Sequence, residues 1–264
     1  PSFWNIELAK KITKNKKADL IYSANTLSHI KNFNEIFKAI KYSLSSKGIL
    51  VLEDPSLLEC LKKVAYDQFY CEHLYVFSTI SLQKILDKFD LEIFDIENIS
   101  THGGSNRYFI KKKQNKFYNT KKKVKDEINK ELRYGLNNFA TYKRFARKVK
   151  LSKIKLLNIF RKIKNQKKRI VGYGATAKSC TVLNYCGINK KNIEYFYDTT
   201  SYKINKYLPG SKILVKKYKK LSRNEIDYVF LGAWNFKNEI FKKEKKFIKD
   251  GGKFISHIPF PRIL

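Results

Sequence analysis

Four consecutive residues, Tyr70-Cys71-Glu72-His73, place a phenol, a carboxylate and an imidazole close together in the chain. Groups of these types transfer protons, and the aromatic residues on both sides of the run are able to keep water away from them. The run therefore predicts a catalytic centre for acid–base chemistry. A polar loop with one core tyrosine and one hydrogen-bonded histidine has the same composition, so a structural loop is the open alternative.

Three of the four histidines, His29, His73 and His102, lie in loops that follow predicted strands. Open α/β sheets hold their ligands at the carboxyl ends of the strands. A neutral imidazole is also the natural general base near pH 7. We therefore expect the three histidines to lie at one ligand-binding edge, although a single histidine in such a loop is more often structural.

A second candidate site is the glycine-rich run at residues 172–178, between a predicted strand and a predicted helix. Gly172 and Gly174 let the backbone approach an anion, and the helix amino terminus directs amides toward it. Asp198 follows at the spacing of a dinucleotide fingerprint. The pattern fits a nicotinamide cofactor, the diphosphate of a nucleotide sugar, or a tight turn without a ligand.

The elements that position the first candidate form a strand–helix–strand unit. An apolar run at residues 19–24 predicts a buried parallel strand, and helical spacing at 33–44 predicts a helix that Gly48 ends. Residues 49–52 predict the next strand. The unit indicates a parallel sheet. A helix at 81–89 follows, and residues 92–99 with 107–111 are expected to form an antiparallel hairpin at a sheet edge.

The second half of the chain begins with helical spacing from residue 120 to residue 165, which predicts two basic helices divided near Leu151-Ser152. A second doubly wound unit opens at Arg169. Its strands are expected at residues 170–173, 193–197, 212–215, 227–231 and 252–255, with a helix at 236–248.

Composition limits the classes of function. The formal net charge is +33, and residues 111–170 hold 23 Lys or Arg against 3 acidic residues, so much of the excess belongs to one helical segment. We interpret it as a solvated face rather than a nucleic-acid site. No apolar run is long enough to span a membrane. The four cysteines lack CxxC spacing, which predicts a reducing cytoplasm and no zinc site in this chain.

Five ordered motifs resemble the S-adenosylmethionine (SAM)-dependent C-methyltransferases of nucleotide-linked keto-deoxysugars. They are Asn25-Thr26-Leu27-Ser28-His29-Ile30, Phe69-Tyr70-Cys71-Glu72-His73, Thr101-His102-Gly103-Gly104-Ser105-Asn106-Arg107, Gly172-Tyr173-Gly174-Ala175-Thr176-Ala177-Lys178 and Tyr207-Leu208-Pro209-Gly210. The resemblance implies an α/β fold: part of a class I, Rossmann-like methyltransferase domain at residues 1–113, linking helices at 114–166 and a Rossmann-like domain at 167–264.

The resemblance also implies roles for individual residues. A histidine base removes a proton beside the sugar's keto group, and the enolate takes the methyl group of SAM. His73 matches the base, with Tyr70, Glu72 and His29 as supporting groups, and Ala24 and Asn25 are expected at the cofactor. His102, Gly103, Gly104, Ser105 and Arg107 are expected at the rim of the substrate site. From the electrostatics of the helix terminus alone, Gly172, Tyr173, Gly174 and Lys178 are expected to bind the diphosphate of the sugar nucleotide.

In such proteins the glycine loop that grips SAM and the cysteines that bind zinc lie upstream of the strand at Asp19. We therefore expect this chain to be truncated, and inactive or nearly so by itself. Its expected partner is a nucleotide-linked keto-deoxysugar, with no nucleic acid or membrane, and the residues predict no oligomeric state. The alternatives are an NAD(P)-dependent oxidoreductase that uses Gly172 and Gly174, and a basic nucleic-acid-binding module at residues 111–170.

Overall fold

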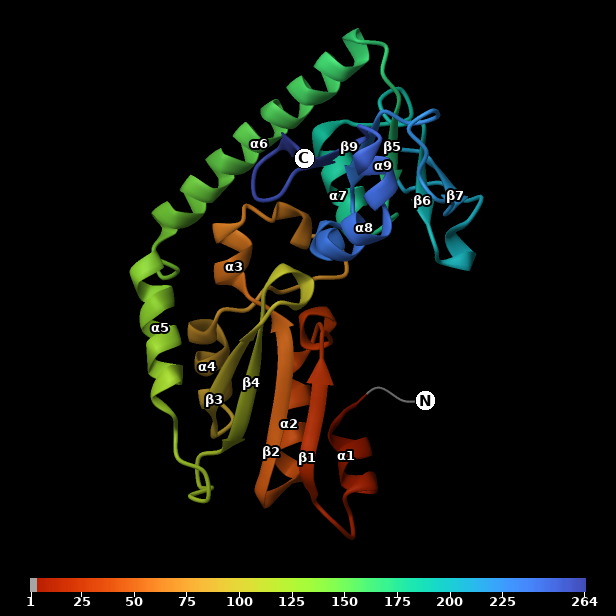
Figure 1. Ribbon diagram of the computed structural model, residues 1–264. Coiled ribbons are helices and arrows are strands. Elements are labelled where there is room, and N and C mark those ends of the chain that lie inside the picture. The colour runs from red at the N-terminus through yellow and green to blue at the C-terminus, as the bar shows by residue number, and fades with distance from the viewer. Residues whose placement is uncertain (1–3) are drawn as a thin grey trace. The chain divides into compact units, whose positions relative to one another are not determined.

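A computed structural model of the chain describes residues 4–264 (Figure 1). They form two compact α/β units. The first holds the described residues up to Cys60 together with Cys71–Tyr142, and the second holds Leu61–Tyr70 together with Lys143–Leu264. The chain therefore passes from one unit to the other at three places: between Cys60 and Leu61, between Tyr70 and Cys71, and between Tyr142 and Lys143. No helix among the described residues is long and apolar enough to cross a membrane.

The first unit contains a four-stranded mixed sheet in the order β1-β2-β4-β3, visible as neighbouring arrows in Figure 1. Its strands are β1 (Ala18–Ala24), β2 (Leu44–Pro55), β3 (Leu91–Ile99) and β4 (Ser105–Lys112). β1 and β2 are parallel, and β4 is antiparallel to both β2 and β3. The carboxyl ends of β1, β2 and β3 therefore lie at one edge of the sheet. The parallel pair and the hairpin are as predicted.

Helices α2 (Phe33–Ser43) and α4 (Thr79–Asp87) pack on one face of this sheet. Phe37 and Leu82 are fully buried there, in the same hydrophobic core as Leu50 of β2. Helix α1 (Ile6–Ile12) contacts α2, and α5 (Lys122–Tyr134) adds Val124 to the same core. Successive side chains of a strand point to opposite faces of the sheet, so one face of this sheet forms the core and the other does not.

Two predictions for this sheet are wrong. β1 is parallel but not buried, because it lies at the sheet edge, and Leu20 and Tyr22 on its outer face are 59% and 60% exposed. Gly48 does not end a helix, because α2 already ends at Ser43 and Gly48 lies inside β2. A Cβ at Gly48 would approach the carbonyl oxygen of Ala18 to 2.5 Å, so the neighbouring strand excludes a side chain there.

The basic segment forms α5 and the long helix α6 (Phe139–Asn165), and its predicted division near Leu151-Ser152 is wrong. The helix break lies at Gly135, which adopts a left-handed conformation with φ +88°. Its amide donates to the carbonyls of Glu131 and Leu132, which closes α5 as a glycine C-cap does. Ser152 is buried inside an unbroken α6.

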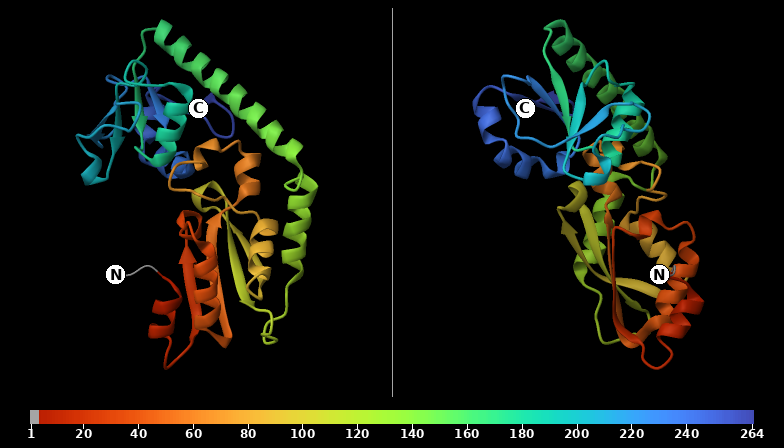
Figure 2. Two further views of the ribbon diagram at one scale, coloured as in Figure 1. Left: turned by 180° about the vertical axis from the view of Figure 1, so that it is seen from behind. Right: turned by 90° about the vertical axis from the view of Figure 1, so that its right-hand side faces the viewer.

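The second unit is doubly wound around a six-stranded sheet in the order β10-β9-β8-β5-β6-β7. β5 (Ile170–Tyr173), β6 (Tyr195–Asp198), β7 (Leu214–Lys217), β8 (Tyr228–Leu231) and β9 (Lys253–Ser256) are parallel, and β10 (Arg262–Ile263), which the sequence did not predict, is antiparallel. Both faces carry helices (Figure 2). One core includes residues of α6 and α7 (Ala177–Cys186), and the other includes residues of α8 (Lys237–Lys243) and α9 (Lys245–Lys249).

The single helix predicted at residues 236–248 is two helices that meet at Glu244. Glu244 is fully buried, and its carboxylate accepts hydrogen bonds from the Tyr218 hydroxyl and the Leu221 amide. Because these partners lie outside the helices, tertiary contacts override the helical periodicity at this residue.

Residues 61–70 belong to the second unit. They include the end of α3 (Leu57–Lys62) and a 3-10 helix, Tyr66–Gln68. Asp67 is fully buried there, and its carboxylate accepts from the Trp234 indole and lies 3.2 Å from Nε2 of His257. Tyr66 packs edge to face on the His257 ring. A segment that precedes His73 in the chain is therefore part of the C-terminal core.

Candidate functional site

His29 and His73 lie against each other in the first unit. His29 belongs to a 3-10 helix, Leu27–His29, that follows β1. The Ser28 carbonyl accepts hydrogen bonds from the amides of Leu74 and Tyr75 at 2.9 and 3.3 Å, which fastens the segment after His73 to this turn. The two imidazole rings meet edge to face with their centroids 5.0 Å apart. Two histidines that were singled out for proton transfer thus form one pair.

The loop of His102 lies at the same edge of the sheet. β3 ends at Ile99, and a 3-10 helix, Thr101–Gly103, holds His102 at a left-handed φ of 53°. The Gly104 carbonyl accepts from the Ser56 amide just beyond β2, so this loop is tied to the end of β2. Ser105 is buried and its hydroxyl donates to the Thr101 carbonyl, which supports the loop from inside.

The other residues predicted for this catalytic and substrate site, Tyr70, Glu72 and Arg107, lie in different surroundings. Glu72 is exposed beside His73, whereas Tyr70 belongs by its contacts to the second unit. The guanidinium of Arg107 pairs with Glu53 and Glu97, so two carboxylates already balance its charge. Its partners raise the pKa of Arg107. Arg107 therefore stabilises the β2–β4–β3 pairing.

The end of β1 carries a polar atom without a partner. Asn25 follows Ala24 with a left-handed φ of 51°, and its amide donates to the Glu53 carbonyl at 2.7 Å. Its side-chain Oδ1 is buried and makes no hydrogen bond with the described residues. A buried acceptor of this kind is unfavourable unless something donates to it, which makes Asn25 suited to bind a ligand donor.

Asp54, at the end of β2, was not singled out from the sequence. It is 1% exposed, and neither carboxylate oxygen makes a hydrogen bond of good geometry with a described residue. Burial raises its pKa to about 6, against the opposing influence of Ser28 and His29. The sequence contains a signal for its burial. In a strand alternate residues share a face, so Asp54 lies on the same core-facing side as Leu50 and Leu52.

The glycine-rich turn of the second unit is packed mainly against the protein itself. A Cβ at Gly172 would meet the Phe196 ring at 2.4 Å, and one at Gly174, where φ is +86°, would meet Ala233 at 2.6 Å. Lys178 is 7% exposed and its ammonium lies 5.5 Å from the Trp234 ring centroid. These glycines are therefore required for close packing, whether or not a ligand binds.

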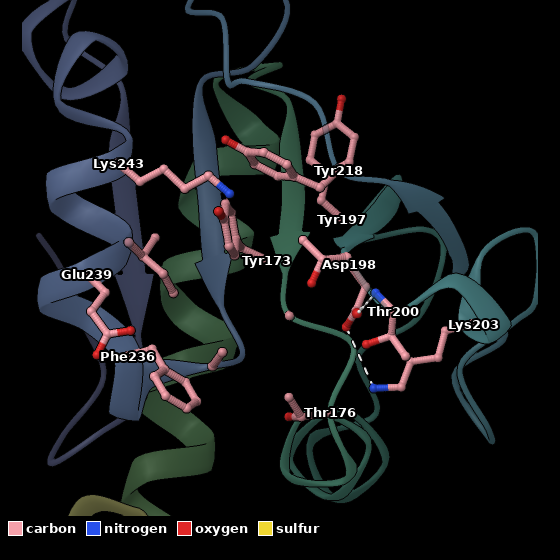
Figure 3. Close-up of a pocket in the computed structure, with 14 residues that line it drawn as sticks. Tyr173, Thr176, Tyr197, Asp198, Thr200, Lys203, Tyr218, Phe236, Glu239 and Lys243 are labelled. Atoms are coloured by element: carbon pink, nitrogen blue, oxygen red, sulfur yellow. Dashed lines mark hydrogen bonds and ion pairs between the residues drawn. The ribbon is translucent and has the colours of Figure 1, made fainter.

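Asp198 organises the loops around this turn. One carboxylate oxygen accepts from the Ala175 amide and the other from the Thr200 amide, each at 2.8 Å. The Lys203 ammonium lies 3.7 Å from the first of these oxygens and donates to the Ala175 carbonyl. Figure 3 shows Thr200 and Lys203 converging on this carboxylate. Both oxygens are thus engaged within the protein.

A pocket of about 380 Å³ opens beside Asp198, at the carboxyl ends of β5, β6 and β8. Tyr173, Tyr197 and Tyr218 line it together with Lys203 and Lys243 (Figure 3). The hydroxyls of Tyr218 and Tyr173 both donate to Glu244 at 2.6 and 3.4 Å. Burial and the Glu244 charge raise the pKa of Tyr173 to about 12, so it remains a neutral phenol. Aromatic surface and two cations suit a nucleotide.

No group of three His, Cys, Asp or Glu side chains within residues 4–264 is arranged to hold a metal ion. Tyr173 and Gly174 of the predicted substrate residues line the pocket, whereas Gly172 and Lys178 do not. The structure thus brings His29 and His73 together in one unit, and Tyr173 and Gly174 together in the other.

Comparison with known proteins adds a family context to this geometry. Residues 100–259 match the family described as "C-methyltransferase C-terminal domain", and residues 1–96 match a "Methyltransferase domain". The chain is 30% identical over 265 residues to the C-methyltransferase NovU of Streptomyces niveus. That alignment covers all of this chain and 63% of the relative's length.

Proposed function

Because the chain belongs to the C-methyltransferase family, we propose that the intact protein transfers a methyl group from SAM to a carbon beside the keto group of a nucleotide-linked deoxysugar. The observation that carries the proposal is the contact between His29 and His73 at the carboxyl edge of the first sheet. This is the edge at which α/β proteins hold their substrates. Two adjacent imidazoles there supply a base and a hydrogen-bond donor in reach of one substrate.

In the proposed reaction His73 takes the proton from the carbon next to the keto group. The C–H electron pair moves into the enolate, and the charge on its oxygen is stabilised by a donor such as the His29 imidazole. When bound, SAM would supply an electrophilic methyl group: the enolate carbon would form the new C–C bond while the S–CH₃ bond breaks, and the electron pair of that bond would stay on the sulfur of the departing thioether, S-adenosylhomocysteine. Glu72 and Tyr70 are proposed to orient the base and the substrate, in keeping with the motif they share with His73.

Asn25 is the residue of this chain best suited to contact the cofactor. Its buried Oδ1 makes no hydrogen bond with the described residues, and it accepts the type of donor that the amino group of SAM offers. Ala24, which precedes it at the end of β1, is proposed as its neighbour in this contact. The residues at the end of β1 therefore fit part of a SAM site.

The loop at residues 102–105 is proposed as the rim that faces the sugar, because it is fastened to the end of β2 at the same edge. Arg107 is proposed to support this rim through Glu53 and Glu97. In the second unit we propose that the tyrosine-lined pocket is a nucleotide-binding site, with Tyr173 and Gly174 in contact and Gly172 and Lys178 supporting the turn.

The alternative oxidoreductase is less well supported. A dinucleotide fold uses the carboxylate after the second strand to bind a ribose hydroxyl. Here Asp198 holds that position, but both of its oxygens already accept from backbone amides. Family membership and this occupied carboxylate both favour methyl transfer.

The direct test uses the intact protein with SAM and a dTDP-linked 4-keto-deoxysugar. Mass spectrometry of the sugar nucleotide is expected to find a gain of one methyl group, and NMR is expected to locate it on carbon. Methylation of oxygen, or no methylation by a folded protein that binds both substrates, would overturn the proposal. Calorimetry with NAD(H) and NADP(H) is the companion measurement, and we expect no binding.

A further inference from the structure

Glu244 is a buried carboxylate that holds two residues of the tyrosine-lined pocket. It is fully buried where α8 and α9 meet, and it does not itself line the pocket. Its Oε1 accepts hydrogen bonds from the hydroxyls of Tyr218 and Tyr173 at 2.6 and 3.4 Å. Its Oε2 accepts from the Leu221 amide at 3.2 Å. Because a buried charge is unfavourable without hydrogen bonds, the carboxylate favours the arrangement in which these hydroxyls face it.

The ring of Tyr218 also has aromatic neighbours. It packs edge to face against Tyr173 and Tyr197, with centroids 5.6 and 6.3 Å apart and interplanar angles of 61° and 77°. The Lys243 ammonium lies 3.5 Å from the centroid of the same ring, a cation–π contact. Figure 3 shows the Lys243 side chain extending toward these tyrosines. The orientation of one ring therefore also decides where the Lys243 charge lies in the pocket.

The hydroxyl of Tyr218 keeps its proton at physiological pH. Burial, followed by the hydrogen bond to Glu244, raises the pKa of Tyr218 above its ordinary value. A neutral phenol has a single proton to donate, so the short bond to Glu244 fixes the hydroxyl end of the ring. The other charged groups that line the pocket are Asp198 with its partner Lys203, and the exposed Glu239.

We propose that Glu244 is a positioning residue for nucleotide binding: by holding the Tyr218 hydroxyl, it fixes an aromatic wall for the base and places the Lys243 ammonium for the phosphates. The inference rests on the proposed nucleotide site. Ordering a side chain during binding costs free energy, so a ring that is held beforehand gives a higher affinity. The proposal also gives a functional reason for the division between α8 and α9, because the carboxylate at their junction is the group that holds the ring.

The experiment measures dTDP binding to this chain by calorimetry, with Glu244→Gln as the first variant. The one oxygen of glutamine cannot accept from the tyrosine hydroxyls and from the Leu221 amide together, so the hold on Tyr218 weakens. Kd is expected to rise about fivefold. Loss of the negative charge alone would tighten the binding of an anion, so weaker binding identifies lost positioning.

Glu131→Gln is the matched control. Glu131 is also fully buried, and its carboxylate accepts from two backbone amides of the first unit. Its Kd for dTDP is expected to stay within twofold of the native value.

Tyr218→Phe is the second variant, because it keeps the ring and removes the hydroxyl that Glu244 holds. A similar rise in Kd is expected, and adding Glu244→Gln to it is expected to change Kd by less than twofold. A merely structural effect of Glu244 would add to that of Tyr218→Phe. Without ligand, nuclear Overhauser contacts between the Tyr218 ring and the Lys243 side chain are expected to weaken severalfold in both variants, and to persist in Glu131→Gln. Tyr218→Phe alone decides if Glu244→Gln fails to fold.

Native or tighter dTDP binding by the folded variants would overturn the inference, and so would additive effects or unchanged ring contacts. If the native chain binds no dTDP, the proposed nucleotide site fails. Ring contacts that weaken as expected would then show that Glu244 still places Tyr218 and Lys243. The two failures are therefore distinguishable.

Discussion

The imidazoles of His29 and His73 meet edge to face, 5.0 Å between centroids, although they come from separate loops of the first unit. The link between the loops is the Ser28 carbonyl, which accepts from the two residues that follow His73. The interplanar angle of the two rings is 80°. The structure therefore places the two histidines of the proposed proton-transfer site in direct contact.

Asp54→Asn is expected to stabilise the protein at neutral pH. Burial raises the folded pKa of Asp54 from 3.8 to about 6, so the fold favours the protonated form and loses stability as the pH rises from about 4 to about 6. Asparagine removes this cost, which is at most about 3 kcal/mol. Urea unfolding is expected to give a higher midpoint for the variant at pH 7.5 and equal midpoints near pH 4. A variant less stable than the native protein at pH 7.5 would contradict this origin of the shift.

Gly135→Ala is expected to destabilise the protein through the α5–α6 junction. Gly135 and Gly251 share a φ of +88°, but a Cβ at Gly135 would lie 2.7 Å from Oγ1 of Thr141, whereas a Cβ at Gly251 would meet nothing within 4 Å. The left-handed conformation costs about 1–2 kcal/mol for alanine at either position. Urea unfolding is expected to find a larger loss for Gly135→Ala than for Gly251→Ala, and equal losses would show that the Thr141 contact is unimportant.

Trp234→Phe is expected to loosen residues 61–70. The indole donates to the fully buried Asp67, and phenylalanine would remove that donor while keeping an aromatic ring. Loss of one hydrogen bond to a buried carboxylate lowers the free energy of unfolding by about 1–3 kcal/mol. Hydrogen exchange followed by mass spectrometry is expected to be faster in residues 61–70, with the β1–β2 pair unaffected. Equal protection in both proteins would contradict the anchoring role of Asp67.

Lys243→Ala is expected to weaken nucleoside diphosphate binding in the tyrosine-lined pocket. The Lys243 ammonium lies 3.5 Å from the Tyr218 ring centroid at the pocket. Loss of one charge-assisted contact corresponds to about a tenfold increase in Kd. Calorimetry with dTDP measures it, with Lys242→Ala as the control, because Lys242 is exposed next to it but does not line the pocket. Equal affinities of the two variants would exclude Lys243 from the site.

Much of the fold follows from local patterns. Helical spacing predicts α2 and α4, and apolar runs followed by turns predict β1 and β5 close to their observed bounds. Only the centre of β2 was predicted, at residues 49–52, whereas the strand spans Leu44–Pro55. The α5–α6 break was misplaced because Gly135 is a local signal that the periodicity on both sides outweighed. The division at Glu244 depends on partners at Tyr218 and Leu221, which no helical window contains.

Individual residues of the candidate site could be predicted from the sequence, but which of them lie together could not. Motif order singled out His29 and His73, yet their contact depends on tertiary links such as the hydrogen bonds that the Ser28 carbonyl accepts from Leu74 and Tyr75. Tyr70 and His73 are three residues apart in one predicted motif, but the contacts of residues 61–70 place Tyr70 with the second unit. Asp54 was missed because a carboxylate at a strand end reads as the start of a loop, whereas its burial is a tertiary property.

The central claim is that His73 removes a proton from the carbon beside the keto group. Its most direct test is deuterium incorporation at that carbon in D₂O, with the intact enzyme, the keto-deoxysugar nucleotide and no SAM. The native enzyme is expected to exchange this hydrogen, and His73→Gln is expected to exchange it at least about a hundredfold more slowly. Lys31→Ala, an exposed change two residues from His29, is expected to exchange normally. Native exchange rates in folded His73→Gln would contradict the claim.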